Sequence, residues 1–151
     1  MAKSLPTRSV AVIGAATAGA EVAGLLSAHG ILVAVFEQNT RPYGKIEDGL
    51  PRWHEGLRRK EYEKIRAKLA QPGVHFVPST RIGRDIDFAE LVEGWGFHAV
   101  VLANGAWRDR PLALEGAEAY VGRGLLYQNP FVIAFNHLQD PGYDGPRFAI
   151  R

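Results

Sequence analysis

The feature that most constrains the fold is the stretch VAVIGAATAGAE, residues 10–21. A short apolar run ends at Gly14, and small residues then open a segment with helical periodicity. We predict a buried strand over residues 9–13, a helix over 17–29 and a second strand over 31–36. A strand, a tight turn, a helix and a strand within about 30 residues are typical of a βαβ unit. Such a unit predicts a parallel sheet in an α/β fold.

The turn itself carries a chemical expectation. Gly14, Ala16 and Gly19 occupy the three positions of the G-x-G-x-x-G dinucleotide fingerprint. The first glycine allows the tight turn, the second lets a pyrophosphate approach the backbone, and the third lets helix and strand pack closely. The methyl group of Ala16 intrudes on the pyrophosphate approach, whereas the hydroxyl of Thr17 offers a phosphate oxygen a hydrogen bond. We therefore predict a site that is altered but still binds.

Glu37 ends the second predicted strand, 23 residues after Gly14. An acid at this place accepts hydrogen bonds from a ribose. It also repels a 2′-phosphate, which favours FAD or NAD over NADP at this first site. The alternative is a purely structural βαβ unit with a tight turn; the flanking strands and Glu37 together favour the dinucleotide site.

The rest of the chain is less regular. We expect an irregular stretch over residues 38–56, a charged helix over 57–70, a short helix over 87–93, and strands over 74–77, 81–82 and 99–103. Either Asp85 or Asp87 is expected to cap the short helix. The basic residues of 57–70 alternate with glutamates, which is typical of a solvated helix face. Beyond residue 111 the pattern weakens around one apolar segment, residues 131–138, to which no element is assigned.

Composition excludes several kinds of site. A chain of 151 residues corresponds to about one domain. The absence of cysteine excludes disulfides, thiolate metal ligands and cysteine nucleophiles, and His137 near Asp140 lacks the partners of a metal site. A net charge of +2 gives no reason to expect nucleic acid. The apolar runs are shorter than the ~20 residues that span a bilayer, and the N-terminus lacks the apolar core of a signal peptide. We therefore expect a cytoplasmic protein without a nucleic-acid or membrane partner.

Five segments, taken together, resemble a known family. They are VAVIGAATAGAEVAGLLSAHGILVAVFEQNTRPYG, GLPRWH, STRIGRDIDFAEL, AVVLANGAWRDRPLALEG and GRGLLYQNPFV. Their order and content are similar to the FAD-dependent NAD(P)H oxidoreductases of the adrenodoxin reductase and glutamate synthase small subunit type. The resemblance implies a Rossmann-like, three-layer fold of the FAD/NAD(P)-binding type. It also implies the family reaction, in which a hydride passes from NAD(P)H to FAD and electrons leave for an acceptor such as ferredoxin.

The resemblance further implies the residues that contact FAD. Gly14, Ala15, Ala16, Thr17, Ala18 and Gly19 would hold the pyrophosphate; Glu37 the ribose; Gln38, Gly44 and Lys45 the pyrophosphate and ribityl side; Ile82 the adenine; and Ala103, Asn104 and Gly105 would bring main chain close to the cofactor. A plain turn is the alternative for Asn104-Gly105. His54 matches a histidine near the flavin and is the candidate catalytic residue, with an ordinary loop histidine as the alternative.

Two departures from the family concern the same side of the cofactor. Ala16 and Tyr43 stand where glycine is usual, and both are expected to line the phosphate side of FAD. Trp53 and Trp107 are expected to be packing residues rather than flavin stackers.

The family pattern also predicts the organisation of the chain. We expect a tail over residues 1–8, an FAD-binding domain over 9–115 and a connecting segment over 116–151 that leads toward an NAD(P)H-binding domain absent from this chain. NAD(P)H would bind only through that domain, so we expect this length alone to be inactive. The exposed face is expected to recruit a second copy or a partner chain. The alternatives are a non-catalytic nucleotide-binding or interaction module completed by a partner, and an NAD-binding domain.

Overall fold

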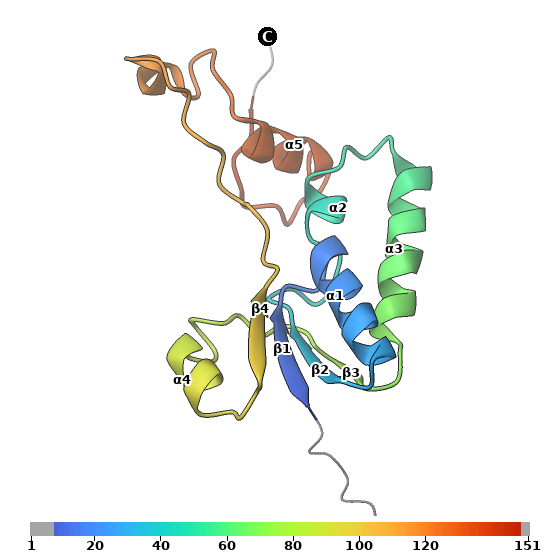
Figure 1. Cartoon of the computed structure of the whole chain (residues 1–151). Coiled ribbons are helices and arrows are strands. Elements are labelled where there is room, and N and C mark those ends of the chain that lie inside the picture. Colours follow the sequence, from blue (N-terminus) through green and yellow to red (C-terminus); the bar gives the residue numbers. More distant parts are fainter. Residues whose placement is uncertain (1–7, 149–151) are drawn as a thin grey trace, which may run out of the picture.

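The centre of the molecule is a four-stranded parallel sheet with the strand order β3-β2-β1-β4 (Figure 1). The structure is a computed structural model that describes residues 8–148. The strands are β1 (Ser9–Ile13), β2 (Leu32–Phe36), β3 (Val74–Val77) and β4 (Ala99–Leu102). The predicted parallel sheet is therefore confirmed.

Helices lie on both faces of this sheet. They are α1 (Thr17–Ala28), α2 (Lys45–Asp48), α3 (Glu55–Leu69), α4 (Phe88–Glu93) and α5 (Gln128–Asn136), with a 3₁₀ turn η1 (Ala117–Tyr120) before the last. Helices α1 and α3 cover one face and α4 covers the other, which gives the expected three layers (Figure 1). Among residues 8–148, no helix combines the length and the apolar character needed to cross a membrane.

Both faces of the sheet are buried, and the side chains of each strand alternate between two apolar clusters. Val10 and Val12 of β1 join the cluster under α1, together with Ala23. Ala11 lies on the opposite face, where it packs with Leu91 of α4. This alternation explains why the apolar run of β1 has no polar face, because every position meets a helix or a neighbouring strand.

Of the two predictions for residues 81–93, the helix cap is confirmed and the strand is wrong. Asp87 is the N-cap of α4, since its Oδ1 accepts the Glu90 N–H at 3.0 Å. Residues 81–82 are not a strand of the sheet, and that prediction is wrong. They belong to a turn in which the Arg81 N–H donates to Asp85 Oδ2 at 2.8 Å, and only an isolated bridge links Ile82 to Ile86. A local carboxylate acceptor takes the place of a ladder partner there.

The chain beyond residue 115 packs back onto the N-terminal half. The Asn136 Nδ2 of α5 donates to the carbonyl oxygens of Glu47, Asp48 and Leu50 at 3.3, 2.8 and 3.1 Å. These acceptors lie at the end of α2, so the Asn136 amide links α5 to α2. The two helices lie close together (Figure 1). Neither helix is predicted from the sequence. The expected domain boundary at residue 115 stays a prediction.

Candidate functional site

A cavity of about 700 Å³ opens at the carboxyl ends of the parallel strands. Ile13 ends β1, Phe36 ends β2 and Leu102 ends β4, and all three line it. The strand order reverses at β1, with β2 on one side and β4 on the other. Open α/β sheets bind ligands at such a reversal point. The cavity is also of the size that small-molecule and cofactor sites have.

Twelve of the fourteen predicted contact residues line this cavity. They are Gly14, Ala16, Thr17, Ala18, Glu37, Gln38, Gly44, Lys45, Ile82, Ala103, Asn104 and Gly105. The other two, Ala15 and Gly19, lie behind its wall: Ala15 is fully buried, and a Cβ on Gly19 would collide with the carbonyl oxygen of Gly14. Segments that are distant in the sequence therefore come together at one cavity, whereas their contacts with a cofactor stay predictions.

The position of Gly14 cannot accommodate a side chain. Its φ of +100° suits glycine, and a Cβ there would lie 2.5 Å from the carbonyl oxygen of Ala103. The turn after β1 thus passes directly against the end of β4. Gly19 fulfils the packing role of the third glycine, because α1 could not approach the turn with a larger residue.

Ala16 faces Gly44 across the cavity wall. A Cβ on Gly44 would lie 3.0 Å from the Ala16 Cβ, and Gly44 has a φ of +47°. Ala16 is also the N-cap of α1 and caps no amide with its side chain. The first-turn amides of α1 therefore have no side-chain cap, and Thr17 and Ala18 line the cavity. Free amides at the start of a twelve-residue helix form a favourable place for an anion.

Glu37 is buried, and both of its carboxylate oxygens are engaged. Oε2 accepts the Ala15 N–H and Oε1 accepts the Asn39 N–H, each at 3.0 Å. The side chain therefore ties the turn after β1 to the segment after β2. A carboxylate has about four lone-pair sites, so each oxygen keeps capacity for a further donor from the cavity.

The wall opposite the turn is formed by the residue 80–88 segment, where Ile82 and Gly83 line the cavity. Asp85 fixes this turn, since it accepts both the Arg81 N–H and the Arg84 guanidinium at 2.8 Å. The hydrogen bond from Arg84, aided by that from the Arg81 amide, lowers the pKa of Asp85 to about 2. The carboxylate thus stays charged throughout the physiological range.

Besides Ala15 and Gly19, two further residues predicted for the site, Tyr43 and His54, do not line the cavity. The placement of Tyr43 is wrong: its buried ring stacks on Tyr62 at 3.9 Å, and its hydroxyl accepts the Arg66 Nε–H at 2.6 Å. Helix α3 supplies both partners and so draws the ring away from the cavity. His54 is exposed before α3, and its Nε2 accepts the Trp53 indole N–H at 3.1 Å. Its catalytic role stays a prediction that this geometry does not support.

Several lining residues are missed by the sequence reasoning. They are Ile13, Phe36, Ile46, Thr80, Arg81, Gly83, Phe88, Leu102 and Trp107. Ile13, Phe36 and Leu102 were open to prediction as the last residues of parallel strands. Trp107, expected to pack, lies at the cavity wall, and its indole N–H donates to the Asn104 carbonyl at 2.9 Å.

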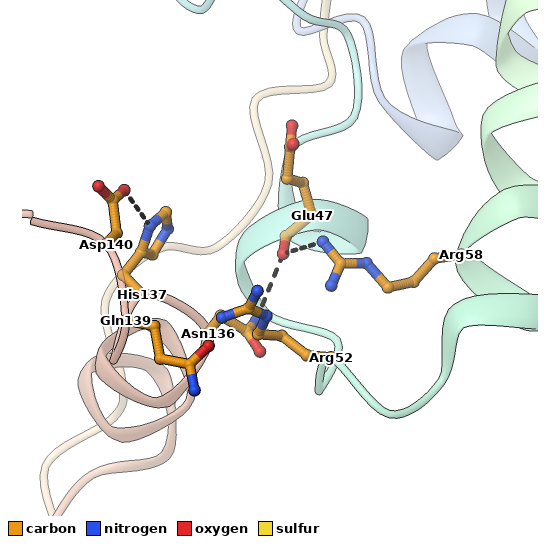
Figure 2. A pocket seen from close by; sticks show the side chains of 7 residues that line it. All are labelled: Glu47, Arg52, Arg58, Asn136, His137, Gln139 and Asp140. Carbon is orange, nitrogen blue, oxygen red and sulfur yellow. Dashed lines mark hydrogen bonds and ion pairs between the residues drawn. The ribbon is translucent and has the colours of Figure 1, made fainter. Parts of the chain in front are cut away.

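A second, more polar cavity of about 440 Å³ lies between α2, α3 and α5 (Figure 2). Its lining residues are Glu47, Arg52, Arg58, Asn136, His137, Gln139 and Asp140. The Arg58 guanidinium donates to the Glu47 carbonyl at 2.8 Å, beside the bond from Asn136. No group of three potential metal ligands occurs among residues 8–148. The His137 ring lies within 3.5 Å of the Asp48 and Asp140 carboxylates and stacks on Tyr143. This cavity therefore lies beside the contact between α2 and α5.

Comparison with known proteins decides the relationship. No protein-family model matches the sequence. The glutamate synthase [NADPH] small chain of Bacillus subtilis is 37% identical over 120 residues, which cover 80% of this chain. The chain is a homologue of glutamate synthase small chains. The NADPH-Fe(3+) oxidoreductase subunit beta of Geobacter sulfurreducens is a further relative, 32% identical over 77% of the chain. The chain spans only 23% and 17% of the lengths of these two relatives.

The fold is shared with a solved oxidoreductase. Mycobacterium tuberculosis FprA, solved in complex with NADPH, matches 89% of this chain with a TM-score of 0.73 and 22% sequence identity. The match covers 30% of the FprA chain. This likeness establishes the Rossmann-like α/β fold that the sequence predicts.

Proposed function

We propose that the 700 Å³ cavity binds FAD and that the chain is the FAD-binding portion of a flavin-dependent NAD(P)H oxidoreductase. The observation that carries the proposal is the pair of hydrogen bonds accepted by Glu37, which connect the Gly14–Gly19 turn to the segment after β2. That arrangement places a ribose acceptor beside free helix amides, as a dinucleotide requires. The NADPH named for its relatives supports the same class of reaction.

The described residues fit such a ligand. The turn and the first amides of α1 would receive the diphosphate, and the spare lone pairs of Glu37 would accept the ribose hydroxyls. The main chain at Ile82 would meet the adenine. When bound, FAD supplies the hydride-accepting chemistry; the protein binds it, orients it and excludes water. NADPH as electron donor and a ferredoxin-like acceptor complete the proposal.

The first test is retention of FAD by the purified protein, followed by titration calorimetry with FAD, NAD and ADP. We expect a visible flavin spectrum after gel filtration and tighter binding of FAD than of NAD. Glu37→Gln should weaken FAD binding about tenfold or more, because its amide offers one acceptor oxygen where two are used. Glu63→Gln, on the exposed face of α3, is the matched control. Tighter binding of NAD would instead identify an NAD-binding domain.

A second candidate function is a non-catalytic interaction module. It is favoured by the apolar side chains exposed around β4 and α4, namely Phe88, Val92, Trp95 and Leu102, the last of which is 64% exposed. Exposed apolar side chains mark an interaction site where they form one patch. Phe88 and Leu102 also line the 700 Å³ cavity. A protein that binds no dinucleotide but associates reversibly with itself would support this candidate over the first.

A further inference from the structure

We infer that the Lys45 ammonium is the cationic partner of the dinucleotide diphosphate, and that Asn129 of α5 positions it at the cavity wall. The inference rests on the proposed function. It places a positive charge beside the Gly14–Gly19 turn, where the methyl group of Ala16 narrows the approach for a phosphate. It also gives the C-terminal segment a part in cofactor binding.

The position of Lys45 is well determined by its neighbours. It is the first residue of α2 and lines the cavity. Its Nζ donates to Asn129 Oδ1 at 2.9 Å and lies 5.6 Å from the centroid of the Trp107 ring. Both partners are themselves anchored: the Asn129 backbone N–H donates to the Asp109 carboxylate at 3.2 Å, and Trp107 bonds to Asn104.

The ammonium lies on the phosphate side of the cavity. Gly44, the residue before Lys45, would bring a Cβ to 3.0 Å from the Ala16 Cβ and to 4.0 Å from the Trp107 ring. The ring that the ammonium faces therefore also borders the contact between Gly44 and the turn. Ile82 and the adenine wall belong to the segment on the other side of the sheet.

The charge of Lys45 is not balanced by an acid. Within residues 8–148, ion pairs join Arg41 to Glu47, Lys64 to Glu61, Lys68 to Glu21 and Arg84 to Asp85. Lys45 forms none, because its partners are a neutral amide oxygen and an aromatic face. The nearby Asp109 carboxylate accepts the Asn129 amide instead. An anion that enters the cavity therefore has no carboxylate to displace from the ammonium.

A diphosphate is a suitable partner for this cation. Charge-assisted hydrogen bonds to phosphate are short and strong, and lysine binds phosphate as a point charge. The ammonium has three N–H donors, so it can keep its bond to Asn129 Oδ1 and still donate to an oxygen anion in the same cavity. The loss of such a bond corresponds to a roughly 10- to 100-fold weaker affinity.

The test compares Lys45→Met with the wild-type protein, using FAD, ADP and adenosine as probes in calorimetry. We expect FAD and ADP to bind about 10- to 100-fold more weakly to the variant, with adenosine unchanged, because adenosine lacks the diphosphate. The dependence of FAD affinity on salt should also become shallower. Lys45→Arg should restore most of the affinity. Lys60→Met, exposed on α3, is the control with the same loss of charge.

The outcomes separate the two proposals. Wild-type protein that binds FAD, together with an equally tight Lys45→Met variant, overturns the inference and leaves the proposed function standing. An equal loss of ADP and adenosine overturns it as well, because a structural role would weaken both. Wild-type protein that binds neither FAD nor ADP overturns the proposed function and the inference with it. Thermal unfolding of both variants identifies any loss caused by misfolding.

Discussion

Ala16 and Gly44 are in contact at the cavity wall. The turn accommodates the methyl group of Ala16, at a position where the fingerprint has glycine, because Gly44 has no side chain. Removing that methyl group in Ala16→Gly opens the phosphate approach. We expect tighter FAD binding and a free energy of unfolding changed by less than about 1 kcal/mol. Glycine is a better N-cap than alanine, which offsets the greater freedom of the unfolded chain. Calorimetry and urea unfolding measure both quantities; weaker binding would mean that the turn is built around the alanine.

The low pKa of Asp85 predicts a pH dependence of the turn at residues 81–85, which forms part of the cavity wall. Its pKa of about 2 lies below the unfolded value of about 3.9. Its contribution to the turn is therefore fully present above about pH 4 and is lost as the pH falls through about 2. We expect carbon-detected NMR to show the Asp85 carboxyl titrating near pH 2 in the wild type. In Arg84→Met the midpoint should move back toward 3.9; an unchanged midpoint would contradict the assigned cause.

At the scale of elements, the Asn136 side chain makes three of the hydrogen bonds between α5 and the end of α2. Asn136→Ala removes the donor shared by three carbonyl oxygens at the end of α2, and the Asn136 side chain itself is buried. We expect the free energy of unfolding to fall by about 1–3 kcal/mol. Hydrogen exchange of the α5 amides should accelerate while that of β1 stays unchanged. Gln139→Ala, at the rim of the same second cavity, is the control. Uniform acceleration in both elements would show that α5 is not a separate unit.

Local patterns predicted some elements well and others poorly. The β1–α1–β2 unit follows from neighbouring residues alone, because the apolar runs and Gly14 act within a few positions. Helix α5 was missed although Pro130 sits in its first turn, where proline is tolerated. Its partner α2 has four residues, too few for a periodic signal, and forms where Asn136 meets its carbonyls. Such long-range contacts leave no local pattern to detect.

The same limit applies to the site. Glu37 was predictable because its place at a strand end has a chemical meaning. The departure of Tyr43 from the cavity was not, because it depends on Tyr62 and Arg66 in α3. Trp107 was assigned to packing for the same reason, since its place at the cavity wall depends on contacts distant in sequence.

At the scale of the whole molecule, β4 is an edge strand among the described residues, and apolar side chains are exposed beside it. Its sequence AVVL carries no charge or proline, the usual protection of an edge. We expect concentration-dependent self-association in sedimentation velocity experiments. Val92→Glu, on α4 and outside the main cavity, should reduce it, whereas Leu25→Glu on α1 should not. A monomer at all concentrations would contradict this expectation.

The bond between Asn136 and α2 also has a consequence during synthesis. Asp48 and Asn136 lie 88 positions apart. At about 5–20 residues per second, the ribosome adds that length in about 4–18 seconds. The turn and Glu37 can form early in that interval, but the wall that carries Lys45 is secured only when α5 emerges. If the chain binds the proposed dinucleotide, a nascent chain should therefore bind it late, after nearly the whole of the described structure has left the ribosome.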